Sequence, residues 1–261
     1  MNIRRTYGLV LRYLYLFKHS FDRLTDAFYW PTIDVILWGL TSVYITRNFS
    51  GKENIALVLL SGLIFWWVIW RSQYEITVNI LEDLWDKNFI NVFVSPVKFR
   101  EWVSALLTLG IIKSFLSLGF MSIVAFLLYK VNIFIFGFHL IPFVFLLIIS
   151  GWWVGFIVAG IILRYGTRIQ TLAWSMVAIF GPFSGIFFPI SALPEWAQKV
   201  SMFVPMSYIF EGMREVVKTG TISTDKIIVS LLLNGLYIVL ALIFLKKSFN
   251  KRFENGLIGL S

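Results

Sequence analysis

The amino-acid sequence predicts an all-α integral membrane protein, and three observations support that prediction. Hydrophobic residues make up 58% of the 261 residues and charged residues only 14%, which is well below the roughly 25% of soluble domains. Six segments are apolar and close to or above the roughly 17 to 25 residues that cross a bilayer. Residues 185–214 join the last two segments and contain three prolines, so they cannot form one continuous helix. We expect a single transmembrane domain over residues 1–261.

Residues 1–27 are predicted to form an amphipathic helix that lies in the membrane interface. Arg5, Arg12, His19 and Asp26 recur every seven residues, while leucine, valine and phenylalanine fill the remaining surface. A helix with one charged face and one apolar face lies along the headgroup region rather than across the bilayer. Two roles are open for this helix: simple anchoring in the membrane, or coupling between the membrane and a partner.

The predicted spans fix the topology. They are residues 28–46, 55–72, 104–129, 138–163, 171–188 and 226–246. Because their number is even, both termini lie on one side, and the basic residues decide which side that is. Fifteen Lys and Arg lie in the two termini and the second and fourth connections, whereas seven, including Lys52, lie in the first, third and fifth connections. The positive-inside rule therefore predicts cytoplasmic termini and an extracellular position for residues 185–214.

Two charged residues lie within the predicted spans. Asp34 follows Pro31 near the start of the first span, and Lys113 lies well inside the third. Ionisable side chains inside a membrane are candidates for a transport path. The alternative is that both reach the headgroups, Lys113 by extending along its long span and Asp34 because it lies near the end of its own.

The connection of residues 75–103 contains a short amphipathic segment that ends at Ser95-Pro96. Apolar residues recur there at helical spacing and charged residues form the other side. The segment consists of Leu81, Glu82, Asp83, Leu84, Trp85, Asp86 and Lys87. A short helix presented to the cytoplasm can dock in the groove of a partner. The alternative is a solvated or interfacial helix without a partner.

Several motifs are missing from the sequence. His19 and His139 are the two histidines, which leaves no zinc helix and no basis for a histidine-dependent catalytic triad. The absence of cysteine excludes disulfides and thiolate metal sites. No phosphate-binding loop of the G-x-x-x-x-G-K-[ST] type occurs, so any ATPase would be another subunit. The basic residues lie between apolar spans, and anionic lipid headgroups explain them better than nucleic acid.

Residues 185–214 carry the most specific pattern. They contain Phe-Phe-Pro-Ile-Ser, Leu-Pro-x-Trp, Val-Pro-Met-Ser-Tyr and Glu-Gly-Met-Arg, with Pro189, Leu193, Pro194, Trp196, Pro205, Tyr208, Glu211 and Arg214 as the marker residues. This pattern resembles the late region of ABC-2 type transporter permeases, a family of bacterial drug, nodulation-factor and polysaccharide exporters. The resemblance implies short re-entrant helices that close the outer end of the path. Glu211 and Arg214 are interpreted as a weak surface ion pair rather than a gate.

The resemblance also implies partners. Members of the family pair two permeases with two separate ATPase subunits, which would make this chain one half of a homodimeric permease in the cell membrane. ATP and magnesium would bind to the ATPase, so no cofactor and no catalytic residue are expected in this chain. Residues 81–87 would contact the ATPase as a coupling helix, with residues 164–170 as a lesser contact. The cargo would be amphipathic: drug-like, a lipid, or a lipid-linked glycan or polysaccharide.

A rival hypothesis comes from a different class of membrane protein. An ATP-independent channel, scramblase or ion-coupled carrier would need no partner ATPase. Its charged residues should line a path at the membrane midplane. Asp34 and Lys113 are the residues on which this alternative depends.

Overall fold

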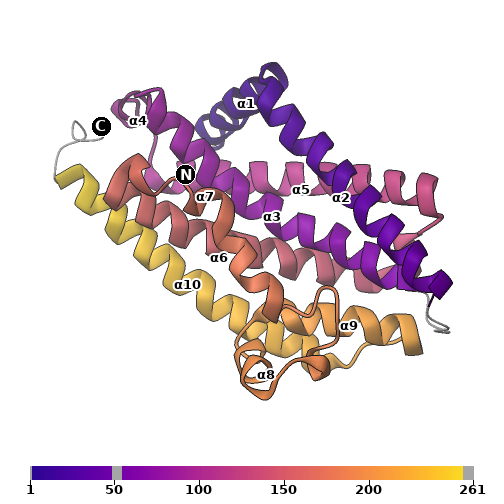
Figure 1. The fold of residues 1–261 in the computed structure, drawn as a ribbon. Coiled ribbons are helices and arrows are strands. Elements are labelled where there is room, and N and C mark those ends of the chain that lie inside the picture. The colour runs from indigo at the N-terminus through magenta and orange to yellow at the C-terminus, as the bar shows by residue number, and fades with distance from the viewer. Residues whose placement is uncertain (1, 49–54, 255–261) are drawn as a thin grey trace.

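The chain folds into long helices that run side by side, with shorter helices at both ends of the bundle (Figure 1). The computed structural model describes residues 2–48 and 55–254, so Lys52 of the predicted first outer connection and the last seven residues of the predicted domain lie outside the described part. Every regular element within the described ranges is a helix. The predicted all-α fold class is confirmed.

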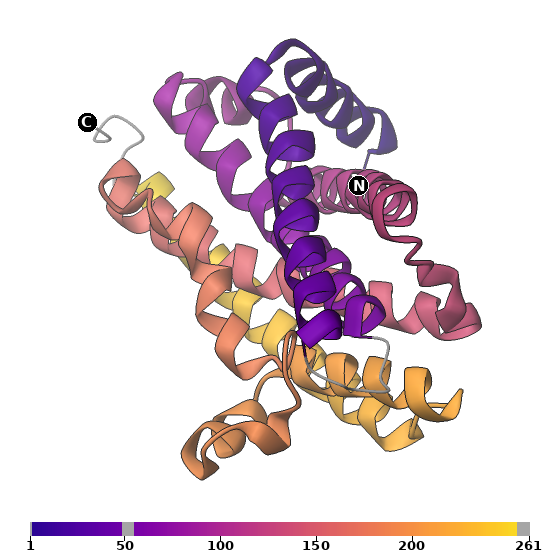
Figure 2. The ribbon, with the colours of Figure 1, turned by 45° about the vertical axis from the view of Figure 1, so that its right-hand side comes forward.

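The long helices are α2 (Phe21–Asn48), α3 (Ile55–Trp85), α5 (Phe99–Tyr129), α6 (Leu140–Tyr165) and α10 (Thr224–Glu254). The N-terminal helix α1 (Ile3–His19) packs against α5 and α2 as an arm on the outside of the bundle (Figure 2). The shorter elements are α4 (Phe89–Val94), η1 (Ile133–His139), η2 (Gly166–Ile169), α7 (Leu172–Ser175), η3 (Met176–Phe183), η4 (Ile190–Ala192), α8 (Glu195–Ser201) and α9 (Pro205–Thr219).

Four segments of the described residues are long and apolar enough to cross a membrane. They are Ile55–Trp85, Phe99–Tyr129, Ile133–Ile169 and Thr224–Arg252, and they contain the second, third, fourth and sixth predicted spans. The first predicted span lies inside α2, whose 28 residues extend ~42 Å at 1.5 Å per residue. This helix is long enough to cross but less apolar, and it packs along α3 and α5. The count of six spans stays a prediction.

The fifth predicted span, residues 171–188, is not one long helix. Its apolar helical part, Leu172–Phe183, is ~22 Å long at 1.5 Å per α-helical and 2.0 Å per 3₁₀ residue, compared with about 30 Å for the hydrocarbon core. Most of this stretch is 3₁₀-helix, and Pro182 lies inside it. Gly185 follows with φ +71°, a left-handed conformation that ends the helical path. The segment is therefore too short to cross the core by itself.

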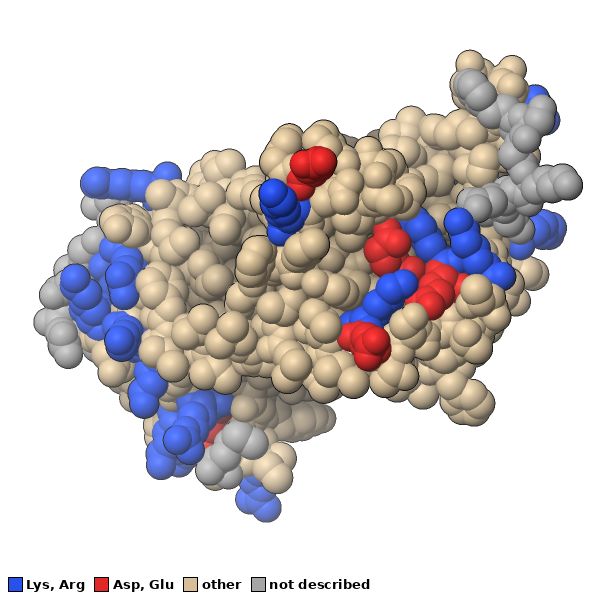
Figure 3. Space-filling model, turned by 90° about the horizontal axis from the view of Figure 1, so that it is seen from below, with Lys and Arg blue, Asp and Glu red and all other residues tan. Residues whose placement is uncertain are grey.

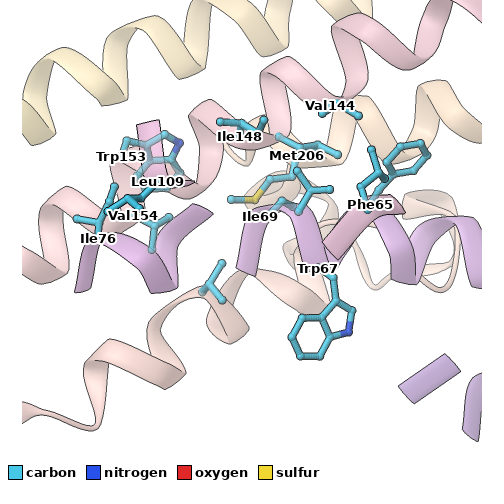
Figure 4. Close-up of a cluster of buried hydrophobic side chains, with 14 of the residues drawn as sticks. Phe65, Trp67, Ile69, Ile76, Leu109, Val144, Ile148, Trp153, Val154 and Met206 are labelled. Atoms are coloured by element: carbon cyan, nitrogen blue, oxygen red, sulfur yellow. The ribbon is translucent and has the colours of Figure 1, made fainter. Parts of the chain in front are cut away.

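Helix α6 organises the core, because its most extensive contacts are with α10 on one side and α3 on the other. Figure 4 shows part of this core, where apolar side chains of four helices interlock. The labelled residues are Phe65, Trp67, Ile69 and Ile76 of α3, Leu109 of α5, Val144, Ile148, Trp153 and Val154 of α6, and Met206 of α9. Side chains this large pack efficiently only if the helix backbones approach each other closely at a few positions that have small residues.

Gly151 and Gly155 allow α6 to approach α3 closely. A Cβ atom on Gly151 would lie 2.5 Å from the carbonyl oxygen of Ile69, and one on Gly155 would lie 3.0 Å from the side chain of Ile76. The two glycines form a Gly-x-x-x-Gly sequence, the pattern that brings membrane helices into backbone contact. The contact between α3 and α6 therefore depends on the absence of side chains at these two positions.

Charge is distributed unevenly along the bundle. Figure 3 shows Lys and Arg gathered at the end where α10 finishes and both signs of charge at the opposite end near α9; the broad surface between them is uncharged except for one acidic and one basic side chain that lie together. An uncharged band between two polar ends is the surface that a bilayer requires. The basic end agrees with the predicted cytoplasmic side, although the orientation itself stays a prediction.

The α3–α6 contact predicts the effect of a single added methyl group. Gly151→Ala forces a backbone shift and should destabilise the protein by about 1–3 kcal/mol, as overpacked cores do. The measurement is thermal unfolding of the purified protein in detergent. Gly235→Ala on the exposed side of α10 is the matched control, because an added Cβ meets no described heavy atom within 4 Å. Equal melting temperatures for the two variants would contradict the close contact.

Candidate functional site

The end of α3 forms a sharp corner with α4. Lys87 adopts a left-handed conformation, φ 54°, and the amides of Lys87 and Asn88 donate to the carbonyls of Leu84 and Asp83 at 3.1 and 2.8 Å. This pair of hydrogen bonds is the Schellman motif that ends many helices. Helix α4 then begins at Phe89, one residue after the turn.

The corner changes the prediction for residues 81–87. They do not form a separate amphipathic helix, because Leu81 to Trp85 are the last residues of α3 and Asp86 and Lys87 form the turn. Leu81, Asp83 and Leu84 are buried inside the chain and Glu82 is half-buried, so these residues are not free to meet a partner. Trp85 is 45% exposed, and Asp86 and Lys87 are exposed with it.

Helix α4 is fastened to the bundle by aromatic side chains. Phe93 contacts Trp102 of α5 at 5.5 Å and Phe249 of α10 at 4.8 Å between ring centroids, both edge to face. Phe89 also contacts Trp102 edge to face. The opposite side of α4 presents Asn91 and Val94 to the surface. We call Trp85, Asp86, Lys87, Asn91 and Val94 together the α3–α4 corner.

Acidic residues behind the corner hold the first two helices. Asp83 accepts hydrogen bonds from Arg12 Nη2 at 2.5 Å and from the Tyr13 hydroxyl at 2.7 Å, and Glu82 pairs with Arg23 of α2. Burial and, after it, the Asp83 carboxylate raise the pKa of the Tyr13 hydroxyl, which therefore stays protonated and donates. Helix α1 is thus fixed to α3 by charge as well as by apolar packing.

A buried ion-pair cluster lies further along α3. Glu75 accepts from Lys113 Nζ of α5 at 2.6 Å and faces Arg71 Nη1 at 3.6 Å. Glu75 and Arg71 are each 2% exposed and Lys113 is 3% exposed. Charges removed from water to this degree persist only when they are paired and hydrogen-bonded. We call Arg71, Glu75 and Lys113 the charged junction.

The junction joins four helices. Arg71 Nη2 donates to the carbonyl oxygen of Asp26 on α2 at 2.6 Å, and the Tyr74 hydroxyl donates to the Asp26 carboxylate. Lys113 Nζ also lies 4.2 Å from the centroid of the Phe17 ring on α1, a cation–π contact. Helices α1, α2, α3 and α5 therefore meet at one cluster.

The two charged residues predicted in the spans have specific partners. Lys113 does not extend to the headgroups, as one interpretation held, because Glu75 holds its amine inside the protein. Asp34 is half-buried and accepts a hydrogen bond from the Trp67 indole nitrogen at 3.0 Å. The structure does not bring the two together: Lys113 joins the charged junction, and Asp34 pairs separately between α2 and α3.

At the opposite end of the bundle, three prolines begin three short helices. Pro189 and Pro194 precede η4 and α8, and Pro205 is the first residue of α9, where its missing amide costs no hydrogen bond. The Tyr208 hydroxyl donates to the carbonyl of Met202 at 2.9 Å and closes the turn between α8 and α9. Of the remaining marker residues, Trp196 is exposed and Leu193 is half-buried.

Glu211 and Arg214 are not a surface ion pair, as the sequence suggested. Arg214 is buried and lies 3.3 Å from Glu211, and its second guanidinium nitrogen donates to the carbonyl of Gly185. Glu211 in turn accepts from the amide of Ile190 at 2.9 Å. The pair therefore fastens both ends of residues 185–190 to α9, because it satisfies backbone groups that a broken helix leaves open.

Glu215 secures the next turn, between α9 and α10. Its carboxylate accepts from Lys226 Nζ at 2.9 Å and from the hydroxyl and amide of Ser223. These hydrogen bonds hold the pKa of Glu215 at about 2, below its ordinary value. The turn is thus tied by a carboxylate that stays ionised at physiological pH.

Arg71 and Glu75 are the residues that sequence reasoning missed. The second span was predicted to end at residue 72, although α3 continues to Trp85, so Glu75 was placed outside the membrane segment. Two signals could have found the pair. Arg71 and Glu75 are four residues apart on a helix, the spacing of an ion pair, and a lysine deep in another span requires an acidic partner.

The charged junction predicts a large loss of stability for one isosteric change. Glu75→Gln leaves Arg71 and Lys113 buried without a countercharge, and breaking a buried pair costs about 3–5 kcal/mol. Thermal unfolding in detergent measures the loss. The double variant Glu75→Gln with Lys113→Met removes one of the stranded cations and should recover part of it. A single variant as stable as the wild type would show that the pairing is unimportant.

Comparison with known proteins agrees with this arrangement. No curated protein matches the chain. A model of the family described as ABC-2 type transporter matches residues 17–217, well over half of the chain. The match begins in α1, includes the charged junction, the α3–α4 corner and all three proline-started helices, and ends in α9. The chain belongs to the ABC-2 type transporter family, as a permease with several membrane helices.

Proposed function

We propose that the chain is the membrane subunit of an ATP-driven exporter, working as a homodimer with two separate ATPase subunits that bind ATP and magnesium. The observation that carries the proposal is the α3–α4 corner, which exposes Trp85, Asp86 and Lys87 and leads into α4 beside the end of α10 (Figure 1). An exposed corner that is joined to other helices by buried ion pairs is suited to transmit a movement of a bound partner to those helices. The proposed contact surface is this corner rather than the whole of residues 81–87.

Residues 164–170 extend the proposed contact surface. Trp85 stacks on Trp174 of α7 with ring centroids 6.2 Å apart, which places the connection that leads into α7 beside the corner. Arg164, Arg168 and Gln170 are exposed there. A partner that contacts both segments would act on α3 and α6 together.

The ion pairs give a route by which such contact would move the spans. Glu75 lies ten residues before Trp85 on α3, ~15 Å along the helix axis. Because Glu82, Asp83 and Glu75 bind basic residues of α2, α1 and α5 respectively, a displacement of the corner carries these helices with it. Rigid-body motion of a group of helices is the usual basis of alternating access.

Residues 185–214 are proposed as the outer gate. This segment lines one side of a cavity of about 530 Å³ whose walls include Leu57, Phe187 and Pro189 together with the cationic residues Arg214 and Lys218, within the size range of sites for drug-sized ligands. Apolar walls with a cationic residue suit amphipathic cargo, such as a drug-like molecule, a lipid or a lipid-linked glycan. The proposed topology has six spans in the cell membrane, cytoplasmic termini and this segment outside.

An ion-coupled carrier, channel or scramblase is the alternative, and the buried Glu75–Lys113 pair is the observation that favours it. An ion-coupled carrier needs an acidic residue that water or an ion can reach. The enclosed space beside Glu75, Arg71 and Lys113 is too small to hold a water molecule. The junction is therefore better suited to joining helices than to passing ions, which supports the exporter.

The proposed contact predicts the effect of reversing one exposed charge. Asp86→Lys should abolish copurification with the ATPase and cargo-stimulated ATP hydrolysis, because it alters the partner surface without disturbing a buried side chain. Glu195→Lys is the matched control: it also reverses an exposed acidic charge, but on α8, away from the α3–α4 corner. This variant should retain the ATPase.

Both variants should reach the membrane in equal amounts and show the same melting temperature. The assignment of the corner would fail if Asp86→Lys kept wild-type ATPase binding and stimulation. It would also fail if Glu195→Lys lost the ATPase to the same extent.

A further inference from the structure

An apolar groove runs along the outside of α5 near its C-terminal end. Its volume is about 620 Å³, and Phe115, Gly119, Ile123 and Phe126 of α5 form one wall. The other wall comes from η1 and the start of α6, including Phe134 and Leu140. Phe115, Ile123, Phe126 and Phe134 are exposed, so the groove opens toward the surroundings of the bundle and not into its core.

The groove has the length of one membrane leaflet. The α5 wall runs from Phe115 to Leu127, which is ~18 Å at 1.5 Å per residue, slightly more than half of the about 30 Å hydrocarbon core. Gly119 lies in the middle of this wall, and a Cβ added there would meet no described heavy atom within 4 Å. The middle of the groove is therefore open because one side chain is missing.

The end of the groove is marked by a positive charge. Lys130 follows α5 directly in a left-handed conformation, φ 58°, and is exposed. Its amine lies 5.5 Å from the centroid of the Phe126 ring, a side chain of the groove wall. Asn132, also exposed, lines the same end. The apolar groove, which is as long as one leaflet, thus ends beside the amine of Lys130 and the side-chain amide of Asn132, at the level where α5 is expected to leave the bilayer.

We propose that this groove binds one phospholipid of the surrounding leaflet. One acyl chain lies along Gly119, and the phosphate pairs with Lys130 and accepts from the Asn132 amide. The charge of Lys130 favours a lipid over a second protein copy: an apolar helix packed here would leave the Lys130 amine against apolar surface, whereas a phosphate neutralises it. The site is independent of the ATPase contact and of the cargo.

The test compares phospholipid binding by two leucine variants of the full chain. Native mass spectrometry of delipidated protein, titrated with phosphatidylglycerol, counts the lipids bound. Gly119→Leu fills the groove and should weaken binding of the tightest lipid by at least about tenfold. Gly235→Leu is the matched control, because Gly235 is also an exposed helical glycine with open space around it, and it should bind as the wild type does.

A third variant tests the headgroup contact without changing the groove. Lys130→Gln should weaken phosphatidylglycerol binding but leave the binding of diacylglycerol, which has no phosphate, unchanged. Equal phosphatidylglycerol binding by wild type and Gly119→Leu would overturn the proposal. It would also be overturned if Gly119→Leu changed the oligomeric state in size-exclusion light scattering with no change in lipid binding, since the groove would then belong to an interface between copies.

Discussion

The buried carboxylate of Glu75 is the constraint on which the arrangement of the N-terminal half depends. It lies at a depth where an unpaired charge is very costly, and it holds Lys113 at 2.6 Å and Arg71 at 3.6 Å. Each of these cations also contacts another helix: Arg71 donates to the carbonyl oxygen of Asp26 on α2, and Lys113 lies over the Phe17 ring of α1. Because none of these groups can return to water without opening the bundle, the four helices are fixed relative to one another. Such a cluster adds little net stability compared with apolar packing, but it makes one arrangement of the helices much lower in free energy than alternative arrangements.

The core of the C-terminal half is held by close packing, and its ion pairs, Glu211–Arg214 and Glu215–Lys226, lie at its turns. Gly151 and Gly155 let α6 lie directly on the backbone of α3, and α10 packs on the other side of α6. Helix α3 therefore belongs to both halves. Its Ile69 and Ile76 pack on α6, while Arg71 contacts α2 and Glu75 contacts α5. A force on the exposed corner at its end would be shared between a group of helices joined by ion pairs and a group joined by close packing. The outer segment is then the distant end of the same bundle, where Arg214 fastens residues 185–190 to α9.

The fold class and the positions of the apolar helices could be predicted because long apolar runs report burial in lipid directly. The prolines at 189, 194 and 205 likewise showed that residues 185–214 form no single helix, since proline has no amide to donate. Tertiary pairing could not be predicted in the same way. Nothing local shows that Leu81 and Leu84 face the bundle instead of a partner, or that Arg214 turns inward to a carbonyl. The helical form of the fifth predicted span could not be predicted for a related reason: composition records that residues 171–188 are apolar, whereas Pro182 and the backbone at Gly185 decide how far they run as a helix.

The proposed function requires the α3–α4 corner and the proline-rich segment to lie on opposite sides of the membrane. The chain contains no cysteine, so single cysteines introduced at exposed lysines report their side without further changes. The most direct measurement is labelling of Lys87→Cys and Lys199→Cys in intact cells with a membrane-impermeant maleimide. We expect Lys199→Cys on α8 to be labelled from outside and Lys87→Cys to be labelled only after the cells are permeabilised. Labelling of both from the same side, or the reverse pattern, would contradict the orientation and with it the proposed ATPase contact.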